Sequence, residues 1–309
     1  MTILKAEAAD FDQAFEPIAI NRAPRVQDRT IRVVVFNARL SVRADGILSC
    51  IRRPPLSRAD VILLCEAAWR IDGAGSRGLA SKIADALRMS FVYVPEFIRR
   101  QPHHAGWSIG NAIVCAQPLG EIRDVVLPSY KSNWRRVPLH GAPRGIAATA
   151  SFGGRKLTIG VAHLNSRCGP ELRARQMAVY MDGVGGGEPA IIGGDWNTTT
   201  VALPARRSLA GVAARMALQP LRFRYPQAYE PLFDEIARRG FATEGANRAG
   251  APTFTFSRAL PRLMRPKLDW IAARGLSPVE RSAAVIPARP AWRFGRVSDH
   301  DFVICDFSV

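Results

Sequence analysis

The chain has 309 residues, 48% of them hydrophobic and 22% charged, a composition that excludes a disordered or fibrous protein. A formal net charge of +17 favours polyanionic partners such as nucleic acid, phosphorylated molecules or an acidic membrane surface. No apolar run is long enough to cross a bilayer and no signal-peptide pattern begins the chain, so we expect a cytoplasmic protein without stable membrane association.

Short apolar runs alternate with helix-like stretches along the chain, which is typical of an α/β fold. No strand pattern begins before Thr30, so residues 1–28 are predicted to form a weakly structured extension before one domain at residues 29–309. We predict strands at residues 31–36, 61–65, 111–115, 157–162, 189–193, 268–272 and 302–307. We predict helices at residues 76–89, 169–182, 205–219 and 231–239, and loops at residues 101–110, 128–144 and 257–267.

Polar residues stand at the ends of these strands. In chain order they are Asn37, Glu66, His163, Asp195 with Asn197, Asp269 and the pair Asp299–His300. Taken singly, each has an ordinary structural explanation, such as a turn, a helix cap or a hydrogen-bonded core histidine. Eight such residues at strand ends in one chain favour a shared cleft.

The residue types of this cleft indicate phosphate chemistry. Glu66 and Asp299 offer anionic oxygens and Asn37 a neutral one, a donor set that suits Mg²⁺ or Mn²⁺. A histidine beside an aspartate can move a proton, and an Asp-x-Asn turn can hold a water and a phosphoryl oxygen. Together these groups serve in-line attack of an activated water on a phosphate ester.

Several segments resemble motifs of the endonuclease/exonuclease/phosphatase superfamily, which has the deoxyribonuclease-I-like fold. The matching stretches are LLCE at residues 63–66, GNAIVCAQPL at 110–119, AHLNS at 162–166, GGDWN at 193–197, KLDWI at 267–271 and SDH at 298–300. They occur in the family's order over most of the chain. Cys65 and Trp196 depart from the usual glutamine and phenylalanine, and neither change removes a metal ligand.

The resemblance implies a four-layer α/β/β/α sandwich of two packed mixed β-sheets, with one catalytic domain at residues 29–309. It implies a divalent-metal-dependent phosphodiesterase in which Asn37, Glu66 and Asp299 hold Mg²⁺, or alternatively Mn²⁺. By analogy, the catalytic residues are His163, Asp195, Asn197, Asp269 and His300. Asn111 and Arg144 lie where the family places residues that bind the substrate or brace the site.

The substrate is not chosen by the fold, because this superfamily cuts nucleic acids, lipids and small phosphate esters. Arginines crowd the loops at residues 135–136, 206–207, 222–225, 262–267 and 292–293. Some of them stand beside aromatic residues, as at 222–225 and 292–293, and this favours a nuclease acting on DNA or RNA. Codon bias in a G- and C-rich genome would also enrich arginine. The alternatives are a phosphodiesterase or phosphatase for a lipid or small molecule, and a nucleic-acid-binding module, which the full set of ligands argues against.

Overall fold

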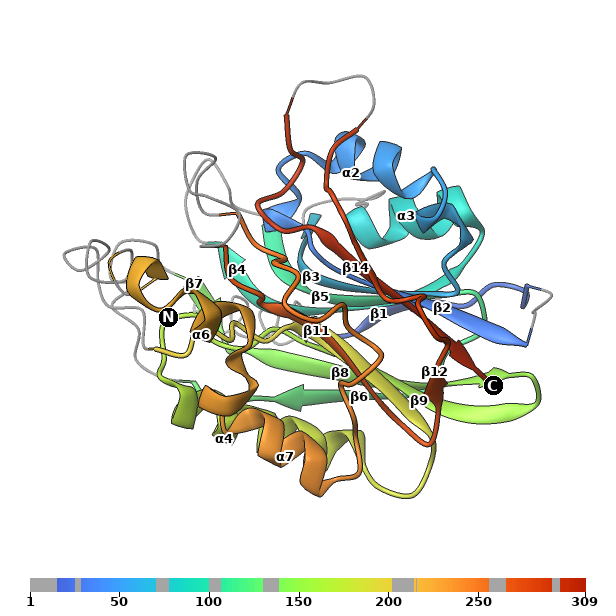
Figure 1. Cartoon of the computed structure of the whole chain (residues 1–309). Helices are drawn as coiled ribbons and strands as arrows, with labels where there is room; N and C mark the ends of the chain where they lie inside the picture. The colour runs from blue at the N-terminus through green and yellow to red at the C-terminus, as the bar shows by residue number, and fades with distance from the viewer. Residues whose placement is uncertain are drawn as a thin grey trace, which may run out of the picture.

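Two β-sheets packed face to face form the centre of the computed structural model (Figure 1). The structure describes residues 16–25, 29–70, 78–99, 107–129, 139–201, 214, 216–255, 265–290 and 295–309. Helices cover the outer face of each sheet, so the layers run helix, sheet, sheet, helix. This arrangement confirms the predicted α/β/β/α sandwich with two mixed sheets.

The first sheet has nine strands within the described residues, in the order β1-β4-β5-β3-β2-β14-β12, with β13 on β14 and β7 on β4. Its strands are β1 (Ile18–Ile20), β2 (Thr30–Asn37), β3 (Val61–Arg70), β4 (Ser90–Arg99), β5 (Trp107–Cys115), β7 (Leu139–Gly141), β12 (Ser277–Pro278), β13 (Ala284–Ile286) and β14 (Phe302–Ser308). The pair β2 and β3 is parallel, and the other pairs are antiparallel.

The second sheet has five strands among the described residues, in the order β11-β10-β9-β8-β6. Its strands are β6 (Gly120–Val126), β8 (Arg144–Phe152), β9 (Arg155–Ala162), β10 (Ala190–Asp195) and β11 (Asp269–Arg274). Here β9 and β10 form the parallel pair. Each sheet therefore has one parallel pair whose carboxyl ends lie at a common edge.

The helices divide between the two outer layers. α2 (Ala44–Ile51) and α3 (Leu79–Leu87) cover the first sheet, and α4 (Pro170–Val184) and α7 (Leu232–Arg238) cover the second (Figure 1). The shorter elements are η1 (Arg39–Ser41), η2 (Leu56–Arg58), α6 (Pro220–Arg224) and η4 (Pro226–Tyr229). Among the described residues, no helix has both the length and the apolar character needed to span a membrane.

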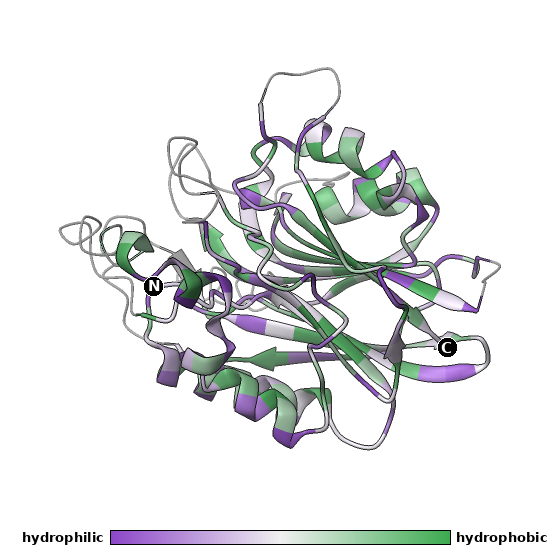
Figure 2. Ribbon diagram, viewed as in Figure 1, coloured by the Kyte–Doolittle hydropathy of each residue, from purple (hydrophilic) through white to green (hydrophobic). Residues whose placement is uncertain are grey.

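Both faces of the central strands are buried, because side chains of alternate residues point to opposite faces of a sheet. In β2, Val33 and Val35 join the apolar core between the sheets, whereas Val34 and Phe36 join the core beneath α2 and α3. Figure 2 shows hydrophobic residues along both sheets and hydrophilic residues on the outward side of α4 and α7. The continuous apolar runs of the sequence follow from this double burial.

All seven predicted strands are present, and the predicted helices at residues 76–89, 169–182 and 231–239 correspond to α3, α4 and α7. Most of the helix predicted at residues 205–219 lies outside the described residues. The prediction that no strand precedes Thr30 is wrong, because β1 pairs with the edge strand β4. The predicted loops are wrong in part, because β5 begins at Trp107 and β7 lies within residues 128–144.

Candidate active site

The carboxyl ends of the two parallel pairs meet at one end of the sandwich. Asn37, the last residue of β2, lies beside Cys65 of β3, and Asp195, the last residue of β10, lies opposite Asp269 of β11. The Asn37 side chain donates a hydrogen bond from Nδ2 to Oδ2 of Asp195 over 2.9 Å. This contact joins the two sheets within a group of buried polar residues.

Glu66 lies inside β3 at an irregularity in its pairing with β5, between Leu64 and Ala67. Its φ is +52°, a left-handed conformation that is rare for a residue other than glycine. The prediction that Glu66 ends its strand is therefore wrong, since β3 continues to Arg70. The bulge turns the Glu66 carboxylate toward the site, where Oε1 accepts a 3.2 Å hydrogen bond from Asn37 Nδ2.

Asp299 lies on the same rim as Asn37. The neighbouring Ser298 hydroxyl donates to the Asn37 main-chain carbonyl over 2.9 Å and so fixes this loop against the end of β2. Oδ2 of Asp299 is 3.5 Å from Nε of Arg39, and its side chain is partly exposed. Asn37 and Glu66 are thus in direct contact, and Asp299 is held beside Asn37 through Ser298.

His300 lies between two buried carboxylates. Its Nδ1 is 2.8 Å from Oδ2 of Asp269, and its Nε2 is 3.6 Å from Oδ2 of Asp195. Burial favours the neutral imidazole, but the two carboxylates outweigh burial and raise the pKa of His300. The expected form of His300 is the imidazolium, oriented by Asp269 and facing Asp195.

His163 approaches the same carboxylate from the end of β9. Its Nε2 is 3.6 Å from Oδ2 of Asp195 and 4.0 Å from Oε1 of Glu66. Burial again opposes protonation, and the nearby Asp195, Glu66 and Glu96 outweigh it and raise the pKa of His163. Oδ2 of Asp195 therefore lies between two imidazoles and one amide.

Asn197 braces the turn that follows β10. Its main-chain N–H donates to Oδ1 of Asp195 over 3.0 Å, and its side-chain amide donates to the Leu164 carbonyl over 2.8 Å. The first bond orients the Asp195 carboxylate, and the second holds the segment that follows His163. Asn197 is 5% exposed, so its side chain is almost fully buried.

Asn111 is fully buried and Arg144 is partly buried, and the two contact each other. The Asn111 amide donates to the Arg144 carbonyl over 2.7 Å, and the Arg144 guanidinium pairs with Asp124 on β6. The Arg144 main-chain N–H donates to Glu96 over 3.0 Å. Arg144 therefore reaches the site through its main chain, while its guanidinium is paired with the neighbouring strand.

Glu96 is a buried acid that the motif analysis missed. It is 2% exposed, and burial raises its pKa to about 7 even though His163 and the Arg144 N–H favour the charged form. The available signal was a single acid inside the apolar stretch at residues 91–98. Glu96 adds a second carboxylate on the His163 side of the cleft.

Two sets of side chains have the chemistry to hold a divalent cation. Ligand atoms of Asp195, Asp269 and His300 all lie within 4.8 Å of one another, but the hydrogen bond to Asp269 occupies Nδ1 of His300. Asn37, Glu66 and Asp299 offer oxygen atoms, and the latter two are open to solvent. Glu66 and Asp195 converge on one amide, a concentration of negative charge that Mg²⁺ or Mn²⁺ would stabilise.

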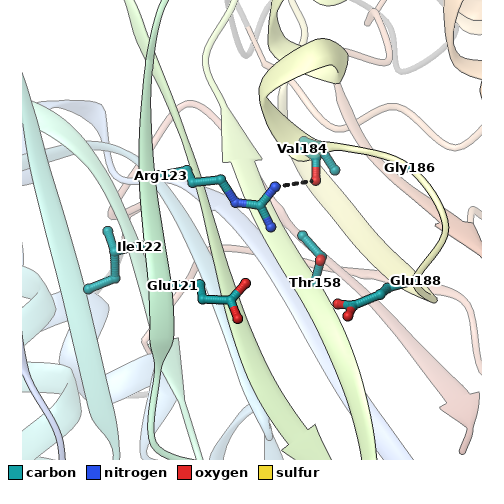
Figure 3. A pocket seen from close by; sticks show the side chains of 7 residues that line it. All are labelled: Glu121, Ile122, Arg123, Thr158, Val184, Gly186 and Glu188. Carbon is teal, nitrogen blue, oxygen red and sulfur yellow. Dashed lines mark hydrogen bonds between the residues drawn. The ribbon is translucent and has the colours of Figure 1, made fainter.

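A hollow of about 520 Å³ is lined by residues of β6, β9 and the end of α4 (Figure 3). In Figure 3 the Arg123 side chain points toward Val184, where it donates to the last carbonyls of α4 over 2.9–3.2 Å. Thr158, which also lines this hollow, pairs with Ala190 at the start of β10, roughly 17 Å from Asp195 at the other end of that strand. This hollow is a helix-capping region and is separate from the polar cluster.

The model of the Endonuclease/Exonuclease/phosphatase family matches residues 35–300. No curated protein matches the chain. Among solved structures, an endonuclease/exonuclease/phosphatase from Beutenbergia cavernae is 20% identical, covers 91% of this chain and 72% of its own, and has a TM-score of 0.63. The human Nocturnin catalytic domain with bound sulfate is 18% identical, with coverages of 95% and 97% and a TM-score of 0.54. D. rerio TDP2 complexed with single strand DNA product is 16% identical, with coverages of 91% and 100% and a TM-score of 0.54.

Proposed function

The chain belongs to the endonuclease/exonuclease/phosphatase family, as its motifs predicted, and from this premise we propose that it is a divalent-metal-dependent nuclease. Members of this family are hydrolases that act on phosphoesters. The observation that supports the proposal most directly is the environment of Asp195, whose carboxylate lies 2.9–3.6 Å from Asn37, His163 and His300. Such a group can orient a water, hold a phosphate and exchange protons.

We assign Asn37, Glu66 and Asp299 to the binding of Mg²⁺, with Mn²⁺ as the alternative. The cation would offset negative charge on the phosphate oxygens. Asp195 orients the attacking water and accepts its proton, and Asn197 keeps the carboxylate in place through its N–H. His300, held by Asp269, donates a hydrogen bond to the phosphate, and His163 does so from the other side.

We infer that DNA or RNA is the substrate, because the net charge of +17 attracts polyanions. One predicted phosphate-gripping segment, residues 222–225, has other partners: Phe223 is buried, Arg222 donates to Thr200, and Arg224 donates to Gly250. Most of the other arginine clusters lie outside the described residues. A lipid or small-molecule phosphate ester remains the alternative substrate.

The substrate panel tests this assignment. Purified protein is mixed with supercoiled plasmid, linear DNA, RNA and a lipid phosphodiester, with Mg²⁺, with Mn²⁺ and with a chelator. We expect nucleic acid to be cut with either cation and to stay intact with the chelator. Cleavage of the lipid while the nucleic acids stay intact would reject DNA and RNA as the substrate.

Asp195→Asn tests the central carboxylate. The amide cannot accept the proton of the water, so we expect kcat to fall roughly 10²- to 10⁴-fold with binding of nucleic acid nearly unchanged. Glu280→Gln, at an exposed acid far along the chain, serves as the matched control and retains full activity. Equal turnover by wild type and Asp195→Asn would remove Asp195 from this role.

A further inference from the structure

A second hollow, of about 300 Å³, lies beside the proposed metal ligands. Its walls are residues 40–42 of the turn after β2, Ala68 of β3 and residues 107–109 at the start of β5. Asn37 precedes this turn, and Glu66 lies two residues before Ala68 in β3. The hollow, which we call the Trp107 pocket, therefore adjoins two of the proposed cation ligands along the chain, Asn37 before its turn and Glu66 in β3.

The Trp107 pocket exists because β2 is shorter than its neighbour. β2 ends at Asn37, whereas β3 continues to Arg70, so a turn takes the place of β2 along the rest of β3. In that turn Arg39, Leu40 and Ser41 have φ values of +47°, +56° and +54°. Ser41 Oγ accepts the Ala68 N–H over 2.9 Å and so holds the turn against the strand. Three consecutive left-handed residues are energetically costly, and such conformations concentrate at ligand sites.

The lining of the Trp107 pocket is mostly apolar, and its rim carries cations. Trp107 is partly exposed, whereas the Ser108 hydroxyl is buried and occupied by the Tyr93 hydroxyl at 2.9 Å. The Arg70 guanidinium carbon lies 5.7 Å from the centre of the Trp107 ring. On the other side, the exposed Arg39 side chain reaches Asp299 at 3.5 Å. The Arg70 guanidinium thus lies over one face of the Trp107 ring, and Arg39 lies next to Asp299, one of the proposed cation ligands.

We propose that the Trp107 pocket receives one unstacked base of a single-stranded nucleic acid, next to the phosphate that is cut. This inference rests on the proposed function. An aromatic ring offers a stacking surface to any base, and flanking arginines attract the phosphates on either side of that nucleotide. A base inside a duplex is stacked and cannot enter a side pocket, so the arrangement favours single-stranded or locally opened substrates. A zwitterionic lipid would give the rim arginines less charge to bind.

Binding is measured by fluorescence anisotropy in the Asp195→Asn background, in which cleavage is expected to be slow. The probes are a labelled ten-nucleotide oligothymidylate and an abasic oligomer of the same length and charge. We expect Trp107→Ala to weaken binding of the oligothymidylate roughly 5- to 100-fold and to leave the abasic oligomer unchanged. Trp107→Phe keeps a ring and should bind almost as wild type. Ala68→Leu fills the pocket without removing the indole and should also weaken binding.

Urea denaturation of each variant checks that it is folded, and Ala68→Leu carries the test if Trp107→Ala does not fold. Unchanged affinity of the folded variants for oligothymidylate would overturn the pocket assignment. The assignment would also be wrong if the variants lost equal affinity for the abasic oligomer. It would likewise be wrong if they lost binding to phosphatidylcholine vesicles and kept binding to the oligonucleotide. Hydrolysis of bis(p-nitrophenyl) phosphate with Mg²⁺ separates the proposed function from the pocket assignment, because this substrate needs the cation site and contains no nucleobase. Failure of wild type in that assay rejects the proposed function whatever the pocket does.

Discussion

Lys267 is an ammonium group buried near Asp269, a member of the polar cluster at the strand ends. It is 1% exposed, its Nζ lies 4.4 Å from the centre of the Trp270 ring, and among the described residues it has no hydrogen-bond partner. Burial lowers the pKa of Lys267 from 10.5 to about 8, although the neighbouring Asp269 opposes this change. The buried charge therefore makes the stability of the protein depend on pH.

Below pH 8 this lysine is charged in both the folded and the unfolded protein, and the folded state bears the full cost of the buried charge. Between pH 8 and 10.5 the unfolded state binds more protons, so the free energy of unfolding rises with pH, by roughly 3 kcal/mol in all. We expect Lys267→Met to lose this rise. Urea denaturation at pH 7 and pH 10 measures it, with Lys156→Met, at an exposed lysine, as the control. Parallel pH dependence in wild type and Lys267→Met would contradict the argument.

Among individual residues, the sequence predicted the candidate site residues that directly follow an apolar run, such as Asn37, His163 and Asp195. It missed Glu96 because that acid lies within β4 and not at its end. It also missed the Trp107 pocket, because Trp107 falls in a segment that its neighbouring proline, histidines and glycines marked as a loop. A side chain that faces a site from within a strand does not stand at the end of an apolar run, so this pattern in the sequence does not reveal it.

Among the elements, the end of β10 shows how closely the strands approach one another behind the site. Gly194 has a φ of +145°, and a Cβ atom built there would lie 2.1 Å from the carbonyl oxygen of Ala162 in β9. Gly194 is followed directly by Asp195. The absence of a side chain at residue 194 is thus what lets β10 place that carboxylate beside His163.

We expect Gly194→Ala to lower the free energy of unfolding by roughly 1–3 kcal/mol or more and to reduce kcat, because β10 must move away from β9. Gly186→Ala is the matched control, since a Cβ atom there has no atom within 4 Å. Urea denaturation together with steady-state kinetics measures both effects. A Gly194→Ala protein with the stability and turnover of wild type would show that β10 adapts without cost.

The strands that the sequence predicted and those it missed differ in composition. The seven predicted strands contain continuous apolar runs, because they are buried on both faces. β4 contains Pro95, which argues against a strand but here lies at an irregularity in the pairing with β5. β8 is rich in alanine, and β6 carries charged residues on the edge of its sheet. The positions of β4, β6 and β8 in the sheets depend more on pairing with neighbouring strands than on the β-propensity of their own residues.

For the molecule as a whole, the net charge of +17 predicts how binding responds to salt. If arginines and lysines contact phosphates, bound counterions are released, and affinity falls steeply as salt rises. For six or more contacts, we expect a loss of roughly 10³-fold or more between 50 and 200 mM salt. Anisotropy of a labelled oligonucleotide with Asp195→Asn measures it. A flat response would indicate that the arginine content reflects codon usage.

The contact between Asn37 and Asp195 joins residues from different sheets that are 158 positions apart in the chain. Neither sheet alone contains both residues, so neither sheet can form the complete site by itself. A shift of one sheet over the other by a single residue, about 3.3 Å, would separate them. Turnover of a phosphate ester would therefore report whether the two halves of the sandwich are in correct alignment.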